Sequence, residues 1–310
     1  MDTRPRTAPR VAVAVAPPSR AASAAVALID SFDGLKTIPV VALRAAELCA
    51  DPECAAAAVE AVLSRDPTLA SRLLRLVNGP YFGLARPVSS LLQAIMLVGL
   101  KQVRNLVMAE VVGTLGRSRG TPALSRPRLW LHCTAVAVCS QMIARRILGV
   151  GGDDVFLAGL LHDIGLVVLD QAREPELGRA IELHRAGAGS LPDCERRVLD
   201  TDHLQVGLAL SARWKFPAEV ERAIATHHDP PPCAASGLGI GDVVAVAHFL
   251  ARELGFPEVA DAPPEAPGWV AEHVAEQELE YQALVRDFAG EMTKAELFFE
   301  PSSSAVPRRG

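Results

Sequence analysis

The chain has 310 residues, of which half are apolar and 22% are charged, and it carries a net charge of −5 at pH 7. This composition supplies ample apolar surface for a buried core and excludes a disordered chain. The acidic balance argues against a broad nucleic-acid-binding surface, which is normally basic, so we do not expect binding to DNA.

Residues 1–20 are rich in Pro, Arg and Ala without sustained periodicity, which predicts a disordered tail. The apolar run at 11–16 is shorter than the roughly 7–15 residues of a signal peptide's apolar region. We find no apolar run of the roughly 20 residues that a membrane span needs. We therefore expect a cytoplasmic protein without a membrane segment, in which the six cysteines are reduced.

Helical patterns then follow one another, and we predict an N-terminal helical subdomain over residues 21–116. The clearest helix begins at Asp66-Pro67, an N-cap acceptor followed by Pro at the first helical position. Behind it, apolar side chains recur every three or four residues from Leu69 to Val77, and the helix ends at Asn78-Gly79.

A stretch rich in Gly, Ser, Arg and Pro at 116–127 is the predicted boundary to a second helical subdomain over residues 127–256. Most of the histidines lie in this second part. No segment alternates long enough between apolar and polar residues to predict a strand. The predicted fold is therefore all-α, with an N-terminal helical subdomain packed on a second helical bundle.

A Pro-rich linker at 261–268 precedes a last predicted helix over residues 269–300, and a disordered tail follows at 301–310. Apolar residues from Val270 to Met292 recur at helical spacing with acidic residues between them. Such a helix either docks back on the core or pairs with a second copy of the chain, which would give a homodimer through the C-terminal helix.

The apolar segment Val155–Leu161 ends in His162-Asp163 and predicts a helix that is buried on every side. An unsatisfied polar group in such a place costs roughly 2–7 kcal/mol, and an unpaired charge costs far more. Either hydrogen-bond partners or a metal must therefore satisfy the two side chains. Imidazole and carboxylate together suit one or two ions of Fe, Mn or Zn.

Further candidate ligands lie in separate predicted helices, which a bundle can bring to one point. A single histidine is more often a hydrogen-bonded core residue, but this set makes a metal centre the stronger hypothesis. Two ions there could share a carboxylate, activate a water and bind a phosphate. The candidate ligands are His132, His162, Asp163, His203, His227, His228 and Asp242.

The order of His132, His162-Asp163 and Asp242 resembles the HD phosphohydrolase superfamily. The intermediate His203 and His227-His228 resemble the fuller ligand set of its HD-GYP branch, which binds two or three metals. The wider context resembles the HDOD family over about residues 25–255. The segments that carry this resemblance are DPTLASRLLRLVNGPYFG at 66–83, AIMLVGLKQVRNLV at 94–107, FLAGLLHDIG at 156–165, DHLQVGLALSARWKFP at 202–217 and AIATHH at 223–228.

The chain departs from the catalytic relatives in three places. A Pro-rich segment after Asp229 replaces Gly-Tyr-Pro, Leu166 replaces a Lys, and Arg128 replaces a Glu that serves a third metal. A cation at the last position would oppose a metal. The resemblance to HDOD proteins, together with these departures, implies a non-enzymatic signalling module with an HD-like core.

The HDOD resemblance also implies what such a module binds. Its core would hold a divalent metal or a nucleotide, and its surface would contact signalling proteins such as response regulators or cyclic-dinucleotide machinery. The alternative is a metal-dependent HD-type phosphohydrolase or phosphodiesterase, with Asp163 bridging two metals as the catalytic residue. In a third version the metal is structural or sensory and biases the packing of one subdomain on the other.

Two features of the first subdomain have open interpretations. Asn78, Tyr81 and Phe82 match the signature loop of the HDOD family, and they form either a contact surface or a turn whose aromatics fill the joint between subdomains. Lys101, Arg104 and Asn105 could read DNA. On an acidic protein such residues are more typical of a solvated helix face, which is the reading we favour.

Overall fold

The computed structural model describes residues 19–32, 40–51, 53–79, 84, 86–116, 121–122, 124–214, 216–233, 237–261 and 268–299. These residues contain helices and no strand, which confirms the predicted all-α class. The predicted tails at 1–20 and 301–310 lie outside the described residues, apart from Ser19 and Arg20. The helices in chain order are α1 (Arg20–Ser31), α2 (Val40–Ala50), α3 (Ala56–Leu63), α4 (Pro67–Val77), α5 (Leu91–Val98), α6 (Leu100–Gly116), α7 (Arg126–Met142), the π-helix η2 (Ile143–Ile147), α8 (Asp153–Leu161), α9 (Ile164–Ala172), α10 (Glu174–Arg185), α11 (Leu191–Leu199), α12 (His203–Trp214), α13 (Ala218–Thr226), α14 (Ile240–Glu253), α15 (Gly268–Glu276) and α16 (Glu278–Phe299).

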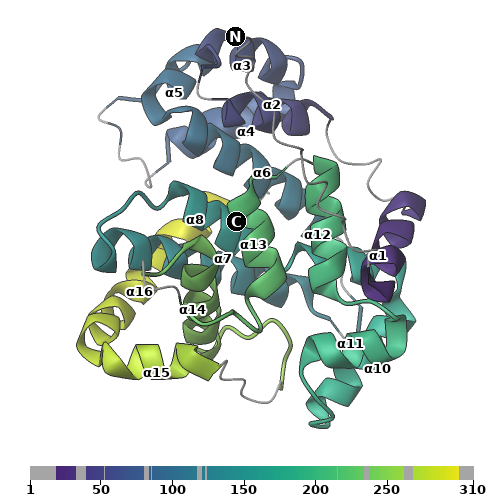
Figure 1. The fold of residues 1–310 in the computed structure, drawn as a ribbon. Coiled ribbons are helices and arrows are strands. Elements are labelled where there is room, and N and C mark those ends of the chain that lie inside the picture. Colours follow the sequence, from purple (N-terminus) through teal and green to yellow (C-terminus); the bar gives the residue numbers. More distant parts are fainter. Residues whose placement is uncertain are drawn as a thin grey trace, which may run out of the picture.

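Helices α2 to α6 form an N-terminal subdomain, with α6 leading down from it to the rest of the fold (Figure 1). Helix α4 begins as predicted, because the Asp66 side chain accepts hydrogen bonds from the amides of Thr68 and Leu69. Asn78 ends this helix and exchanges two hydrogen bonds of 2.8 Å with the Val88 backbone, which fixes the loop's far end. Tyr81 and Phe82 lie outside the described residues.

The predicted boundary at residue 21 assigned helix α1 to the N-terminal subdomain, but its main packing partner lies elsewhere. Helix α1 lies against α12 (Figure 1). The Thr201 hydroxyl donates to the Ala21 carbonyl at 2.9 Å, and Arg213 pairs with Asp30 at 3.1 Å. The first helix of the chain therefore packs on the second subdomain, α7–α14.

The second subdomain is built around α7 and α8, on which α13 and α14 pack, while α12 packs on α9 and α13. Its stretch Asp153–Ala172 is 20 residues long and, by length and composition, apolar enough to cross a membrane. The prediction that no apolar run reaches this length is therefore wrong. However, 89% of the most apolar window is buried inside the fold, as in a core helix. The pair at 91–98 and 100–111 also passes this test but is bent by 112°.

The six cysteines are all free thiols, as the sequence predicted. Cys49, Cys133, Cys139 and Cys194 are buried. Burial raises the pKa of the Cys139 thiol to about 12, so this sulfur stays protonated and behaves as a small apolar side chain.

A polar cluster joins α6 to the N-terminal end of α8. Lys101 pairs with Asp154 at 2.8 Å, and the buried Arg104 pairs with the same carboxylate. The Asn105 amide donates to the Asp153 carbonyl at 2.6 Å. Lys101 is thus exposed, as expected for a solvated face, whereas Arg104 and Asn105 are buried and fasten the N-terminal subdomain to the helix that His162 caps.

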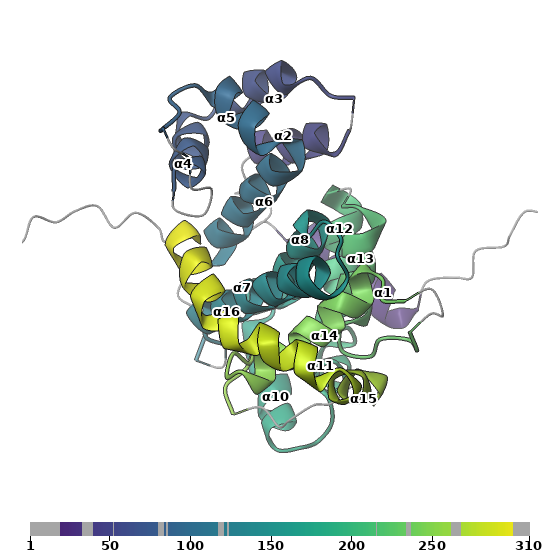
Figure 2. The same ribbon diagram turned by 90° about the vertical axis from the view of Figure 1, so that its left-hand side faces the viewer.

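The predicted C-terminal helix is two helices, α15 and α16, which are separated at Gln277. The apolar face of α16, including Tyr281, Phe288 and Met292, is buried, and the helix lies along α7 (Figure 2). Arg146 of η2 pairs with Asp287 at 2.6 Å. Of the two alternatives, the structure has the docked one, so the apolar face that a homodimer would have used is covered.

Candidate metal centre

Two groups of side chains in the second subdomain place their ligand atoms within 4.8 Å of one another. The first group is His132, His162, Asp163 and His248, and the second group is Asp163, His203, His227 and His228. Asp163 belongs to both. Six of the seven candidate ligands from the sequence therefore come together, and all of these are buried except His228, which is partly exposed.

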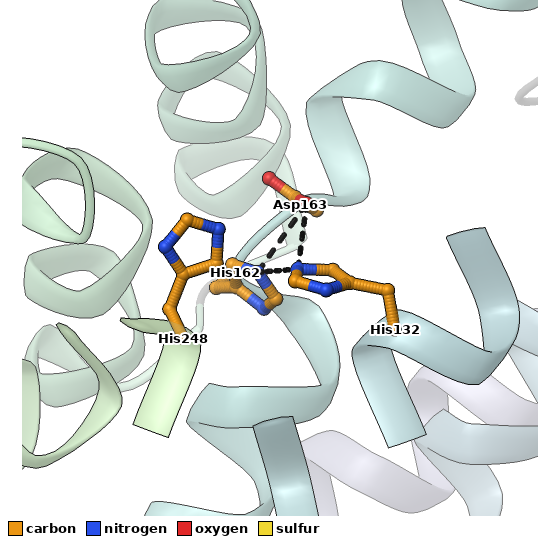
Figure 3. Close-up of side chains that lie close together, drawn as sticks. All are labelled: His132, His162, Asp163 and His248. Atoms are coloured by element: carbon orange, nitrogen blue, oxygen red, sulfur yellow. Dashed lines mark hydrogen bonds and ion pairs between the residues drawn. The ribbon is translucent and has the colours of Figure 1, made fainter. Parts of the chain in front are cut away.

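The first group gathers where α7, α8 and α14 meet. His132 comes from the middle of α7, His162 caps the C-terminal end of α8, and Asp163 follows it. The Nε2 atoms of His132 and His162 lie 3.4 Å and 3.3 Å from Asp163 Oδ2. The rings of His132, His162 and His248 lie in a triangle beside Asp163, with each pair of centroids 5.1–5.4 Å apart (Figure 3).

The second group forms around the other oxygen of Asp163. The Nε2 atoms of His203, at the start of α12, and of His227, which caps α13, lie 3.5 Å and 3.2 Å from Asp163 Oδ1. The ring of His228 lies 5.0 Å from that of His203 between centroids. Each oxygen of the one carboxylate thus faces a different pair of histidines.

Close packing of α9 on α12 brings these two halves together. A Cβ atom on Gly165 would fall 1.9 Å from the His203 carbonyl oxygen, so only glycine allows the two backbones to approach this closely. The contact holds the start of α12, and with it His203, against Asp163. The glycine in the His-Asp-Ile-Gly sequence therefore has a positioning role here.

Hydrogen bonds to Nδ1 fix the orientation of four of the rings. In each ring Nδ1–H donates to an acceptor, which turns Nε2 toward the centre, as in many metal-binding histidines. The acceptors are the Phe256 carbonyl for His132 (2.6 Å), the Gly159 carbonyl for His162 (2.7 Å), the Glu195 carboxylate for His203 (2.6 Å) and the Ala223 carbonyl for His227 (3.1 Å).

The atoms that face the centre lack hydrogen-bond donors. Both oxygens of Asp163 and the Nε2 atoms of His203 and His227 are buried without a hydrogen-bond partner. The Nε2 atoms of His132 and His162 lie 3.1 Å apart, although both are acceptors in these tautomers. Two facing lone pairs repel unless a positive charge lies between them. The residues present therefore fit divalent metal ions.

The pKa values show the same need for positive charge. Burial lowers the pKa of His132 and lowers that of His248 to about 3. Burial also disfavours a charged His203, but the adjacent Glu195 carboxylate, together with Asp163 and Asp202, outweighs burial and raises the pKa of His203 to about 9. Without a metal, a proton on His203 would supply part of the positive charge that the carboxylates require.

Asp242 does not join either group, which corrects the predicted ligand set. It lies in the first turn of α14, where its carboxylate accepts a hydrogen bond of 2.8 Å from the Gly239 amide and caps the helix. His248, six residues later on the same helix, takes the expected place in the first group. The sequence signal for it was a single histidine within the apolar run Val243–Leu250.

Sequence reasoning also missed two buried carboxylates beside the groups. Glu195 of α11 holds both the ring and the backbone amide of His203, with the amide at 2.8 Å. Glu258 accepts a hydrogen bond of 2.7 Å from Arg252 and lies 3.8 Å from the Nε2 atom of His248. Arg128, expected to oppose a third metal, is exposed, so its charge faces solvent.

Each group offers four protein ligands, one from each of its side chains. Structural zinc sites are usually closed by four protein ligands, whereas catalytic ones keep a position for water. Zinc would therefore be enclosed in both groups. A six-coordinate ion would retain open positions, and the partly exposed His228 marks the side nearest solvent among the side chains of the two groups.

Comparison with a family model places the HDOD domain on residues 35–230. An uncharacterized protein of Treponema pallidum (strain Nichols) is 26% identical over 236 residues, which are 74% of this chain and 44% of that protein. The chain thus spans less than half the length of this curated relative.

Three solved structures have a similar fold. An HDOD domain protein of unknown function from Geobacter sulfurreducens is 25% identical, with a TM-score of 0.73 over 91% of this chain and 99% of that one. A proposed phosphohydrolase from Shewanella amazonensis is 22% identical, with a TM-score of 0.65 over 88% and 98%. A proposed signal transduction protein from Marinobacter aquaeolei is 20% identical, with a TM-score of 0.65 over 90% and 65%.

Proposed function

Because this chain belongs to the HDOD domain family, we propose that it is a non-enzymatic, cytoplasmic signalling module whose core holds two divalent ions. In this proposal the ions stabilise and regulate the fold, and the surface contacts signalling proteins such as response regulators or cyclic-dinucleotide machinery. The observation that carries the proposal is the enclosure of each group by four protein ligands, nearly all of them buried. The signalling role is supported by the family and by the likeness of fold to a proposed signal transduction protein.

The ions would supply positive charge between Asp163 and the surrounding Nε2 atoms. His132, His162, Asp163 and His248 would hold one ion, and Asp163, His203, His227 and His228 would hold the other. The chain's own residues orient the rings through Nδ1, as the contacts to Phe256 and Glu195 illustrate. Leu166, where catalytic relatives carry Lys, is buried and offers no charge to a substrate.

The first expected result is two equivalents of Zn, Fe or Mn per chain in protein purified without chelators or an affinity-tag metal. The His162→Ala variant should retain at most one, because its side chain belongs to the first group only. Metal analysis by mass spectrometry measures both. A chain that holds no metal, even after loading with each of the three ions, would contradict the proposal and leave these histidines as core residues.

A metal-dependent phosphohydrolase is the second candidate, and one observation favours it. Asp163 turns one oxygen toward each group, which is the arrangement of a carboxylate bridging two catalytic metals. The loaded protein should then hydrolyse a phosphodiester or a nucleotide at about 1 s⁻¹ or faster, an ordinary enzyme rate. Turnover at that rate that is lost in His162→Ala would replace the first proposal by this one.

Metal affinity should rise with pH between about 6 and 8. His203 has a pKa of about 9 in the metal-free protein, so below that pH a metal must displace one proton to bind. His227 of the same group has a pKa that burial lowers well below its usual value, so it is neutral over this range and releases no proton when a metal binds. The dissociation constant for Zn²⁺ at the second group should therefore fall about tenfold for each pH unit. Titration against a competing chelator measures the slope.

The control for this slope is Glu195→Gln, which removes the carboxylate that raises the pKa of His203. The variant should show a flatter dependence over the same range, because its imidazole is neutral through most of it. Equal slopes in the two proteins would mean that His203 is not the group that releases the proton.

A further inference from the structure

Helices α15 and α16 lie beyond the residues that the HDOD domain model matches, which end at residue 230. They nevertheless contact two segments that support the ligands of the metal centre. One segment follows α14, and the other follows the paired histidines at the end of α13.

The first contact runs through Phe256, just after α14. Its carbonyl accepts the hydrogen bond from His132 Nδ1 at 2.6 Å and so sets the direction in which His132 Nε2 points. Its ring packs edge-on against Phe288 of α16, with centroids 5.8 Å apart and an angle of 74°. Phe288 is 4% exposed, in the buried face by which α16 docks on α7. The docking of α16 and the orientation of His132 thus share one residue.

The second contact runs through Trp269 of α15. Its indole Nε1–H donates to the carbonyls of Pro231 at 2.9 Å and Pro230 at 3.2 Å. These prolines lie two and three residues after His228, in the segment where catalytic relatives carry Gly-Tyr-Pro. Proline restricts the backbone, so a fixed point at Pro230 limits how far His228 can move.

We propose that α15 and α16 form a metal-responsive latch. In it, Phe288 is a positioning residue for His132, and Trp269 is a positioning residue for His228. Metal bound in the core holds His132 and His228 in place, and through Phe256 and Pro230 it holds the two helices against the fold. Loss of metal loosens their docking. Because such coupling is reciprocal, weakening the latch also weakens metal binding.

The latch gives the module a route from its core to its surface. Leu279, near the start of α16, is 78% exposed, whereas the opposite face of that helix is buried on α7. A change in docking would alter what α15 and α16 present to a signalling partner. This inference rests on the proposed metal-holding function and adds to it the element that would report metal occupancy.

The experiment compares hydrogen–deuterium exchange in the full chain after loading with Zn²⁺ and after removal of metal with a chelator, with metal content measured on the same samples. Backbone amides of α15 and α16 should exchange at least about fivefold more slowly in the loaded protein than in the metal-free protein. A factor of about five is the lower end of the typical coupling between two sites. Bound metal with unchanged exchange in these helices would overturn the latch and leave the proposed function standing. Absence of bound metal would overturn both.

A pair of conservative variants separates positioning from general stability. Trp269→Phe removes the Nε1–H donor but keeps an aromatic ring, and it should weaken Zn²⁺ binding about tenfold, as loss of an outer hydrogen bond to a metal site typically does. Phe288→Leu should weaken it in the same direction. Leu279→Ala, on the exposed part of α16, is the matched control and should leave the affinity unchanged. Wild-type affinity in both Trp269→Phe and Phe288→Leu would contradict the proposal.

Discussion

Replacing Asp163 with asparagine should remove both metal ions at once. Asp163 is the one side chain shared by the two groups, and each of its oxygens faces two candidate ligand nitrogens. An amide keeps the shape but loses the negative charge that balances the ions. At a metal concentration of about 100 times the dissociation constant, a bound ion contributes about 2.7 kcal/mol to stability. The melting temperature of the loaded protein should therefore fall on the order of 5 °C in Asp163→Asn.

The same substitution should have little effect in protein that has been stripped of metal. There the Asp163 oxygens accept no hydrogen bond, and their favourable contact is with protonated His203 at 3.5 Å, so the loss of the charge should cost less than the loss of two ions. Melting curves of both proteins, each with Zn²⁺ and with a chelator, measure the difference. An equal fall in melting temperature under the two conditions would show that Asp163 stabilises the fold without a metal.

Gly165→Ala should remove the second ion and spare the first. The added methyl would fall 1.9 Å from the His203 carbonyl oxygen, so α12 must move away from α9 and carry His203 with it. No residue of the first group lies on α12. Overpacking of this kind typically costs about 1–3 kcal/mol, which a chain of this size should survive. Metal analysis should then give about one equivalent in place of two.

Two glycine variants serve as controls for this result. Gly159→Ala would place a methyl 2.9 Å from the Ala137 Cα, between α7 and α8, so it should weaken the first group in preference to the second. Gly290→Ala meets no atom within 4 Å and should leave both ions bound. Loss of both ions in Gly165→Ala, together with retention of a folded circular dichroism spectrum, would mean that the two groups do not bind metal separately.

Most of the side chains in the two groups could be predicted from the sequence, because each candidate ligand interrupts a recognisable helical pattern. His162 and Asp163 end an apolar helix that has no other polar residues after Asp154, and His227-His228 end another helix. A bundle places such helix ends near its centre. Asp242 was chosen for its place in the order of the motif, but an acidic residue in the first turn of a helix is also a typical cap, and the structure uses it as one.

The parts that sequence could not supply depend on contacts between distant segments. The Phe256 carbonyl has no side-chain signature, yet it orients His132 from 124 residues away. Glu195 sits in an amphipathic helix among exposed charges, and only the packing of α11 beside α12 shows that its carboxylate is buried. The assignment of α1 failed for the same reason, because helical periodicity predicts a buried face and does not say which partner covers it.

The prediction of a single C-terminal helix was wrong for a different reason. No Pro or Gly marks the break at Gln277, and the apolar spacing continues across it, so local sequence gave no sign that α15 and α16 change direction there.

The uneven burial of the ligands also affects how fast each ion would exchange with solution. Among the side chains of the two groups, His228 alone has partial solvent exposure, while the side chains of the first group are buried. Ions held by such a centre would exchange in sequence, with the one at the second group leaving early and the one at the fully buried first group leaving late. The occupancy of the first group would then reflect earlier metal concentrations, whereas the occupancy of the second group would follow the present one.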